Sequence, residues 1–161
     1  MIKSIKHFAE ESISIFEKLE EDFFKHPEKM AEYVRGITKE LHKVGILMIQ
    51  ESLEQMNQQL KDSGKRPTGW YIEKDSQKQL VTSLGTVHFT KTLFTNRETG
   101  KMEYLLDRIL GLETHERITE DAVASMLEEA VQTSYRRGGE ESSCYSAFYL
   151  LPKSFYSRQI Q

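Results

Sequence analysis

The stretch Asp62-Ser63-Gly64-Lys65-Arg66-Pro67-Thr68-Gly69 separates two kinds of sequence pattern. Glycine and proline gather where a chain leaves a helix, so this stretch predicts a helix end and a linker. Helical spacing precedes it, and strand-like alternation follows it. The sequence therefore predicts an α+β fold: a long N-terminal helical hairpin, a small antiparallel β-sheet, then a C-terminal helix and an irregular tail.

Two helices are expected before the linker. Residues 2–25 carry apolar side chains close to every 3.6 positions, and His26-Pro27 should end this helix because the residue before a proline avoids helical backbone. Residues 28–62 carry a heptad stripe made of Met30, Val34, Ile37, Leu41, Val44 and Met48. The stripe fits two interpretations. Either the first helix folds back onto the second, or helix 28–62 joins two copies of the chain in a homo-oligomer.

A sheet of three or four strands is expected after the linker. The strand-like runs are 70–72, 79–83, 87–94 and 102–106. Alternation places Val87, Phe89 and Lys91 on one face of the third run. Asn96–Lys101 has the composition of a hairpin turn. A sheet of this size needs a helix over one face.

The C-terminal part is expected to return to helix. Asp107–Leu112 has the pattern of a short helical turn capped by glycine, and Thr119 is a suitable N-cap for a helix that ends before Gly138. Residues 144–161 contain no acidic residue and no regular period. We expect this last segment to diverge from the rest of the chain.

Composition excludes several classes of protein. The chain has 161 residues and a formal net charge of −3, which by itself disfavours a dedicated DNA-binding domain. There is no apolar run long enough to span a membrane and no signal-peptide pattern, so a cytoplasmic location is expected. Cys144 is the single cysteine, which excludes an intrachain disulfide and a cysteine-based zinc site.

No constellation of residues predicts catalysis. The five histidines have no metal-ligand spacing, there is no phosphate-binding glycine loop, and no group that would activate Cys144 is evident. We therefore expect no enzymatic activity, cofactor, metal or small-molecule substrate. Arg136 and Arg137 stand at the end of a predicted helix, where they either contact DNA phosphates or interact with the helix dipole.

An ordered series of motifs resembles the N-terminal third of the ISLre-type insertion-sequence transposases, long described as an uncharacterised protein family. The resemblance covers residues 1 to about 142. Its pieces are Leu80–Val87, Thr99–Asp107, Leu110–Leu112, His115–Asp121 and Glu128–Arg136. More distantly related transposases carry a cysteine knuckle where this chain has Asn96–Lys101, and a tight turn can close the ribbon there without metal.

The resemblance implies a DNA-recognition and assembly region, with the phosphoryl-transfer domain downstream. Because the pattern departs at about Ser142–Cys144, the chain is expected to be a truncated or frameshifted copy. The expected segments are 1–66 (helical hairpin), 67–112 (β-ribbon), 113–143 (partial helix-turn-helix) and 144–161 (divergent tail). Double-stranded DNA is the expected partner, with phosphate contacts from Lys91, Arg136 and Arg137. The alternative is a helical dimerisation module that binds no nucleic acid.

Overall fold

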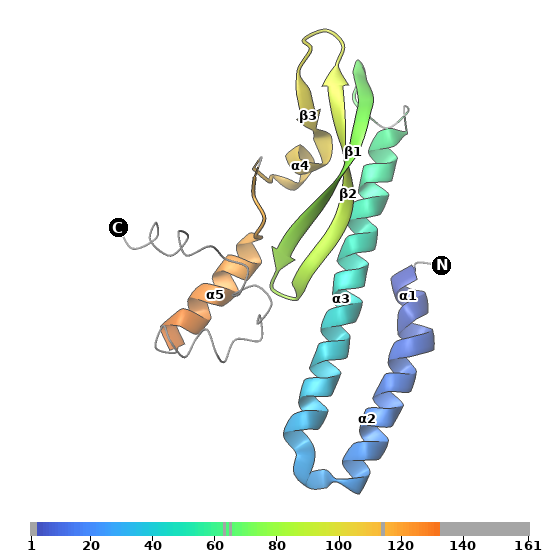
Figure 1. Ribbon diagram of the computed structural model, residues 1–161, viewed down its shortest axis with the longest axis vertical. Coiled ribbons are helices and arrows are strands. Elements are labelled where there is room, and N and C mark those ends of the chain that lie inside the picture. The colour runs from blue at the N-terminus through green and yellow to red at the C-terminus, as the bar shows by residue number, and fades with distance from the viewer. Residues whose placement is uncertain (1–2, 63, 65, 114, 133–161) are drawn as a thin grey trace. The chain divides into compact units, whose positions relative to one another are not determined.

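The computed structural model describes residues 3–62, 64, 66–113 and 115–132. They form the expected α+β fold, with long N-terminal helices, a three-stranded antiparallel sheet and a later helix (Figure 1). The chain divides into two compact units. One comprises Met1–Gln79 with Val87–His115, and the other comprises Leu80–Thr86 with Glu116–Gln161. The expected tail, 144–161, lies outside the described residues.

The first helix is interrupted by one wider turn. It comprises α1 (Lys3–His7), a π-helical turn η1 (Phe8–Ser12) and α2 (Ile13–Lys25), where the sequence pattern predicted a single regular helix. An inserted π turn shifts which residues share a face. Ser4 and Ser12 are consequently both buried against α3 although eight positions separate them. The Ser12 hydroxyl donates to Glu40 across 2.7 Å.

The second helix, α3 (Met30–Lys61), folds back along the first. His26 ends α2 as expected, and the 3₁₀ turn η2 (Pro27–Lys29) leads into α3. Figure 1 shows α1 and α2 lying along α3 in an antiparallel hairpin. Gly36 permits the close approach, because a Cβ there would stand 2.7 Å from Leu19 Cδ2. The hairpin interpretation is thereby confirmed.

Most of the heptad stripe lies outside the contact between the two helices of this hairpin. The side chains that face the first helix include Tyr33, which stacks on Phe23 at 4.6 Å between ring centroids, and the buried Glu40. Met30, Val34, Leu41 and Met48 of the stripe are all more than half exposed. The hairpin therefore leaves these four residues of the stripe exposed, whereas Ile37 and Val44 are half-buried. The use of the stripe in a homo-oligomer stays a prediction.

Glu51 of α3 holds the beginning of α1. Its carboxylate accepts the Lys3 amide at 2.7 Å, the Ser4 amide at 3.0 Å and the Ser4 hydroxyl at 2.8 Å. The first amides of a helix have no partner within the helix and carry a partial positive charge, so a carboxylate satisfies both needs. The bond from the Ser4 amide is the main cause that lowers the pKa of Glu51 below its usual 4.5.

This contact makes a prediction about pH. A carboxyl group whose pKa is lower in the folded state stabilises the fold above its unfolded pKa and loses that contribution as pH falls. We expect Glu51→Gln to lower the melting temperature at pH 7, and the difference from the unaltered protein to shrink below about pH 4.5. Thermal unfolding followed by circular dichroism, at pH 7 and at a pH below about 4.5, measures this difference in melting temperature. Glu54→Gln, at an exposed position of the same helix, controls for loss of a charge. A difference that is the same at both pH values would contradict the contact.

The sheet has the order β1-β2-β3. β1 (Trp70–Thr82) is one continuous strand where two runs were expected, and it is followed by β2 (Gly85–Asn96) and β3 (Met102–Tyr104). β2 pairs with β3 in the register Leu93↔Tyr104. The last strand is shorter than expected because Leu105 and Leu106 begin α4 (Leu105–Leu110). Both leucines are fully buried. A strand points consecutive side chains to opposite faces, so a strand with one buried face could not bury both of them.

The buried face of β2 confirms the expected alternation, because Val87, Phe89 and Lys91 are all buried. The next residue, Thr92, is also buried and binds α3, whereas Lys91 binds α4. Successive residues of a strand point to opposite faces. Both faces of β2 are therefore covered at this point, whereas the sequence predicted that a helix would cover only one face of the sheet.

The second unit is built around Val81. Its amide donates to the Arg117 carbonyl at 2.7 Å, and its own carbonyl accepts the Thr119 amide at 2.9 Å. Helix α5 (Glu120–Gln132) begins directly after Thr119, as expected. The Thr119 hydroxyl donates to the Val81 carbonyl at 3.0 Å. In the described part of the chain, no helix is both long enough and apolar enough to cross a membrane.

Candidate nucleic-acid interface

Lys91, one of the three expected phosphate contacts, lies inside the first unit. Its ammonium group donates to Asp107 of α4 and stands 3.7 Å from the centroid of the Tyr104 ring. Lys78 of β1 binds the other oxygen of Asp107 at 3.2 Å. The side chains of both lysines and of Asp107 are at most 9 % exposed. This placement argues against direct phosphate contact by Lys91.

Arg136 and Arg137, the other two expected contacts, lie outside the described residues. The helix that precedes them, α5, is described as far as Gln132. Their contact with phosphate therefore stays a prediction. Among the described residues, no group of three or more histidine, cysteine, aspartate and glutamate side chains could hold a metal ion.

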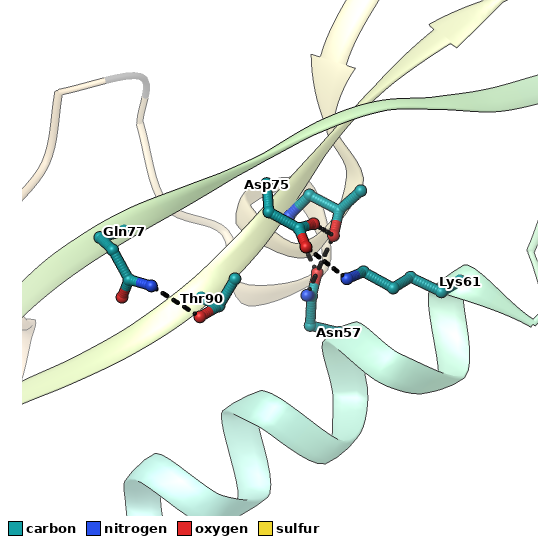
Figure 2. A network of polar contacts seen from close by, with 6 residues as sticks. Asn57, Lys61, Asp75, Gln77 and Thr90 are labelled. Carbon is teal, nitrogen blue, oxygen red and sulfur yellow. Dashed lines mark hydrogen bonds and ion pairs between the residues drawn. The ribbon is translucent and has the colours of Figure 1, made fainter.

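A network of polar contacts joins α3 to the sheet (Figure 2). Asn57 accepts the Thr92 amide at 3.0 Å through its carbonyl oxygen and donates to the Thr92 hydroxyl at 3.0 Å. That hydroxyl donates to Asp75 of β1 at 2.7 Å, and Lys61 reaches the second Asp75 oxygen at 2.7 Å. Hydrogen bonds from Lys61 and then from Thr92 lower the pKa of Asp75. Because each polar side chain here has a protein partner, the network ties α3 to β1 and β2.

Basic and aromatic side chains meet at the end of the sheet where β1 begins. The Arg97 guanidinium lies 4.5 Å from the Tyr71 ring centroid, and the Arg108 guanidinium lies 5.7 Å from the Trp70 ring centroid. With Lys101 from the same turn as Arg97, these residues form what we call the arginine–aromatic cluster. Its members come from β1, the β2–β3 turn and α4, so the fold assembles them from three segments of the chain.

The turn between β2 and β3 positions Arg97. The Asn96 side-chain oxygen accepts the amides of Glu98 and Thr99 at 3.0 Å each, and Gly100 takes the left-handed backbone with φ +68°. The Arg97 amide donates to the Gly69 carbonyl at 2.8 Å, which ties the turn to the start of β1. The tight turn expected from Asn96–Lys101 is thus confirmed.

The cluster is accessible and carries a small positive charge. The side chains of Lys101 and Arg108 are 64 % and 49 % exposed, and both lie 3.3 Å from Glu103. The three cations of the cluster and the two acids of the same segments, Glu98 and Glu103, give a formal charge of +1 in a chain of −3. Arginine binds phosphate through several donors, and aromatic faces stack on bases, so this combination suits nucleic acid.

Sequence reasoning missed this cluster because its members are separated along the chain. Trp70 and Tyr71 stood out only as the start of a strand, and Arg97 only as part of a turn. A usable signal existed. An arginine in the turn after β2 and an aromatic pair at the start of the adjacent strand must meet when the hairpin closes at the same end of the sheet.

Comparison with known proteins gives one consistent result. The model of an uncharacterised protein family, UPF0236, matches residues 25–151. In Caldanaerobacter subterraneus subsp. tengcongensis, one UPF0236 protein whose name joins TTE0033, TTE0744 and further TTE designations is 28 % identical over 142 residues. The UPF0236 protein TTE2489 of the same organism is 26 % identical over 141 residues. Both matches cover 88 % of this chain but only 30 % of the relative. No solved structure matches.

Proposed function

The chain belongs to the uncharacterised protein family UPF0236, and from that premise we propose that it is the DNA-recognition and assembly region of a transposase-like protein. The arginine–aromatic cluster is the surface that contacts the phosphate backbone of double-stranded DNA. We assign phosphoryl transfer to sequence outside this region, because the region aligns with only 30 % of the length of the relatives. The region described here therefore binds DNA and performs no catalysis.

The names of the relatives support the proposal that these proteins are encoded by a mobile element. The name of one UPF0236 protein joins eleven TTE designations within a single organism, and the name of another joins four. A transposing element leaves identical copies of its gene in one genome, so one protein with many designations is what such an element produces. We extend this reasoning to the present chain because 88 % of it aligns with these proteins.

The cluster itself is the observation that carries DNA binding. We expect Arg97→Ala/Arg108→Ala to weaken binding to mixed-sequence duplex DNA by about tenfold or more, which corresponds to about 1.4 kcal/mol. The two arginines lie at the surface, so the melting temperature should change little. Fluorescence anisotropy with labelled duplex measures the affinity. Lys18→Ala/Lys25→Ala removes two exposed cations from α2 as the matched control. Equal losses in both variants would mean that the cluster is not the site.

A second candidate function rests on a different observation. The chain has a net charge of −3, and the helical hairpin exposes large apolar side chains. Both features suit a helical interaction module that binds another protein and no nucleic acid. The two functions differ in one measurement, because an interaction module would leave labelled duplex unbound even at low salt.

A further inference from the structure

The helical hairpin has its polar and apolar side chains in unusual places. Ser12 and Glu40, which lie between the helices, are 0 % and 6 % exposed. Seven large apolar side chains of the hairpin, by contrast, are 44–72 % exposed. They are Met30 and the six that we call the outer apolar face: Ile5, Ile13, Phe24, Val34, Leu41 and Met48. Apolar area in water is unfavourable by about 25 cal/mol per Å². A monomer would gain nothing from this arrangement, whereas a complex that covers the outer face would.

The six side chains point to one side of the hairpin. In the first helix, Ile5, Ile13 and Phe24 each follow an inward-facing residue by one position, namely Ser4, Ser12 and Phe23.

The same relation holds on α3, where Val34 follows Tyr33 and Leu41 follows Glu40. One step along a helix turns the side chain by about 100°. In each helix, the exposed residue is one step further along the chain than the residue that faces the other helix. Because the two helices run antiparallel, this step turns the exposed side chains of both helices to the same side of the hairpin.

This face is large enough for a stable interface. At about 1.5 Å per residue it extends about 21 Å along α3 and about 28 Å along the first helix, and two packed helices are about 20 Å wide. Its footprint is roughly 500 Å², so two copies would bury roughly 1,000 Å² in total, the lower end of the range for a specific protein interface. Glu17 and Glu20, four and seven positions after Ile13, lie on the same stripe and are exposed, which disfavours an anionic membrane or DNA as the occupant.

We propose that a second copy of this chain covers the outer apolar face, so that two hairpins form an antiparallel four-helix bundle. The heptad spacing of α3 is that of helices packed against other helices, and a second copy offers an α3 with the same period. A two-fold axis makes one surface complementary to itself. Leu41 lies near the middle of the stripe from Met30 to Met48, so the axis passes close to Leu41. The dimer is independent of DNA binding and forms without it.

Sedimentation equilibrium of the full chain without DNA tests the proposal. The expected mass is twice that of the 18.8 kDa chain. Leu41→Lys places two buried ammonium groups beside the axis and should raise the dimer dissociation constant at least about 100-fold. Gln58→Lys adds the same charge at another exposed position of α3 and should leave the dimer intact. Circular dichroism establishes that both variants fold. A monomeric unaltered chain, or a dimer that Leu41→Lys leaves unchanged, would overturn the proposal.

A second experiment tests the position of the axis. In a Cys144→Ser background, Leu41→Cys should form an intermolecular disulfide on mild oxidation, because the two copies of residue 41 face each other across the axis. Lys39→Cys lies on the opposite side of α3 and should stay unlinked under the same conditions. Equal linking of both variants, or linking of Lys39→Cys alone, would place the interface elsewhere and overturn the assignment of this face.

Discussion

Asp107→Asn is expected to lower the free energy of unfolding by about 3–5 kcal/mol, the usual loss when one partner of a buried ion pair is removed. Asp107 faces two ammonium groups, those of Lys78 and Lys91, and all three side chains are nearly excluded from water. Asparagine keeps the shape of the side chain but removes its charge. Two cations would then remain buried without a counter-charge, and the stability of a domain this size is itself only about 5–15 kcal/mol.

Urea unfolding followed by circular dichroism measures this loss. Adding Lys91→Met to Asp107→Asn removes one of the two cations and should recover part of the stability, which separates a charge effect from a change in shape. Glu98→Gln, at an exposed position of the β2–β3 turn, should cost less than about 0.5 kcal/mol. A loss below about 1 kcal/mol for Asp107→Asn would mean that water reaches the lysines.

Asn57→Ala is expected to destabilise the first unit by about 2–3 kcal/mol, because a buried amide without a partner costs about 1–3 kcal/mol and a side-chain bond is lost as well. Asn57 is buried and satisfies both the amide and the hydroxyl of Thr92. Its removal would also leave Asp75 and Lys61 as the remaining polar link between β1 and α3 in this network (Figure 2).

The same network contains a matched control. Gln77 donates to the Thr90 hydroxyl at 3.0 Å, but this bond lies at the exposed surface of the sheet (Figure 2). Gln77→Ala should therefore cost less than about 0.5 kcal/mol in the same urea experiment. If the two variants were equally stable, α3 would not depend on Asn57 for its attachment to the sheet.

Local patterns predicted most of the fold. His26-Pro27 marked the end of the first helix because proline restricts its predecessor, and the glycine-rich linker marked the end of α3. The alternation at Val87, Phe89 and Lys91 predicted the buried face of β2. The π turn at Phe8–Ser12 could not be predicted, since it follows from the fit between Ser12 and Glu40, which are 28 positions apart.

The sequence predicted little of the candidate site. Periodicity assigned Lys91 to the buried face of β2, but it could not show that Asp107 and Lys78 would be there to accept a buried cation. Arg97 and Trp70 lie in segments whose meeting depends on how the turn closes against β1. Patterns within one segment predict which face is buried, whereas contacts between segments require the tertiary structure.

Several residues of the motifs that resemble the transposase family stabilise the fold in the described region. Asp107 anchors α4 through two lysines, and Gly111 ends that helix with the left-handed backbone at φ +69°. Thr119 ties the start of α5 to Val81. These roles concern the fold of this chain, and DNA recognition needs its own measurement.

That measurement is an equilibrium titration of labelled duplex DNA with the unaltered chain at about 50 mM and about 200 mM salt. If the chain recognises DNA through phosphate contacts, binding is detectable at low salt and weakens steeply as salt rises, because each contact releases counterions. Arg97→Ala/Arg108→Ala should make that dependence less steep by about one unit for each contact removed. Absence of binding at both salt concentrations would contradict DNA recognition and leave the helical interaction module as the function.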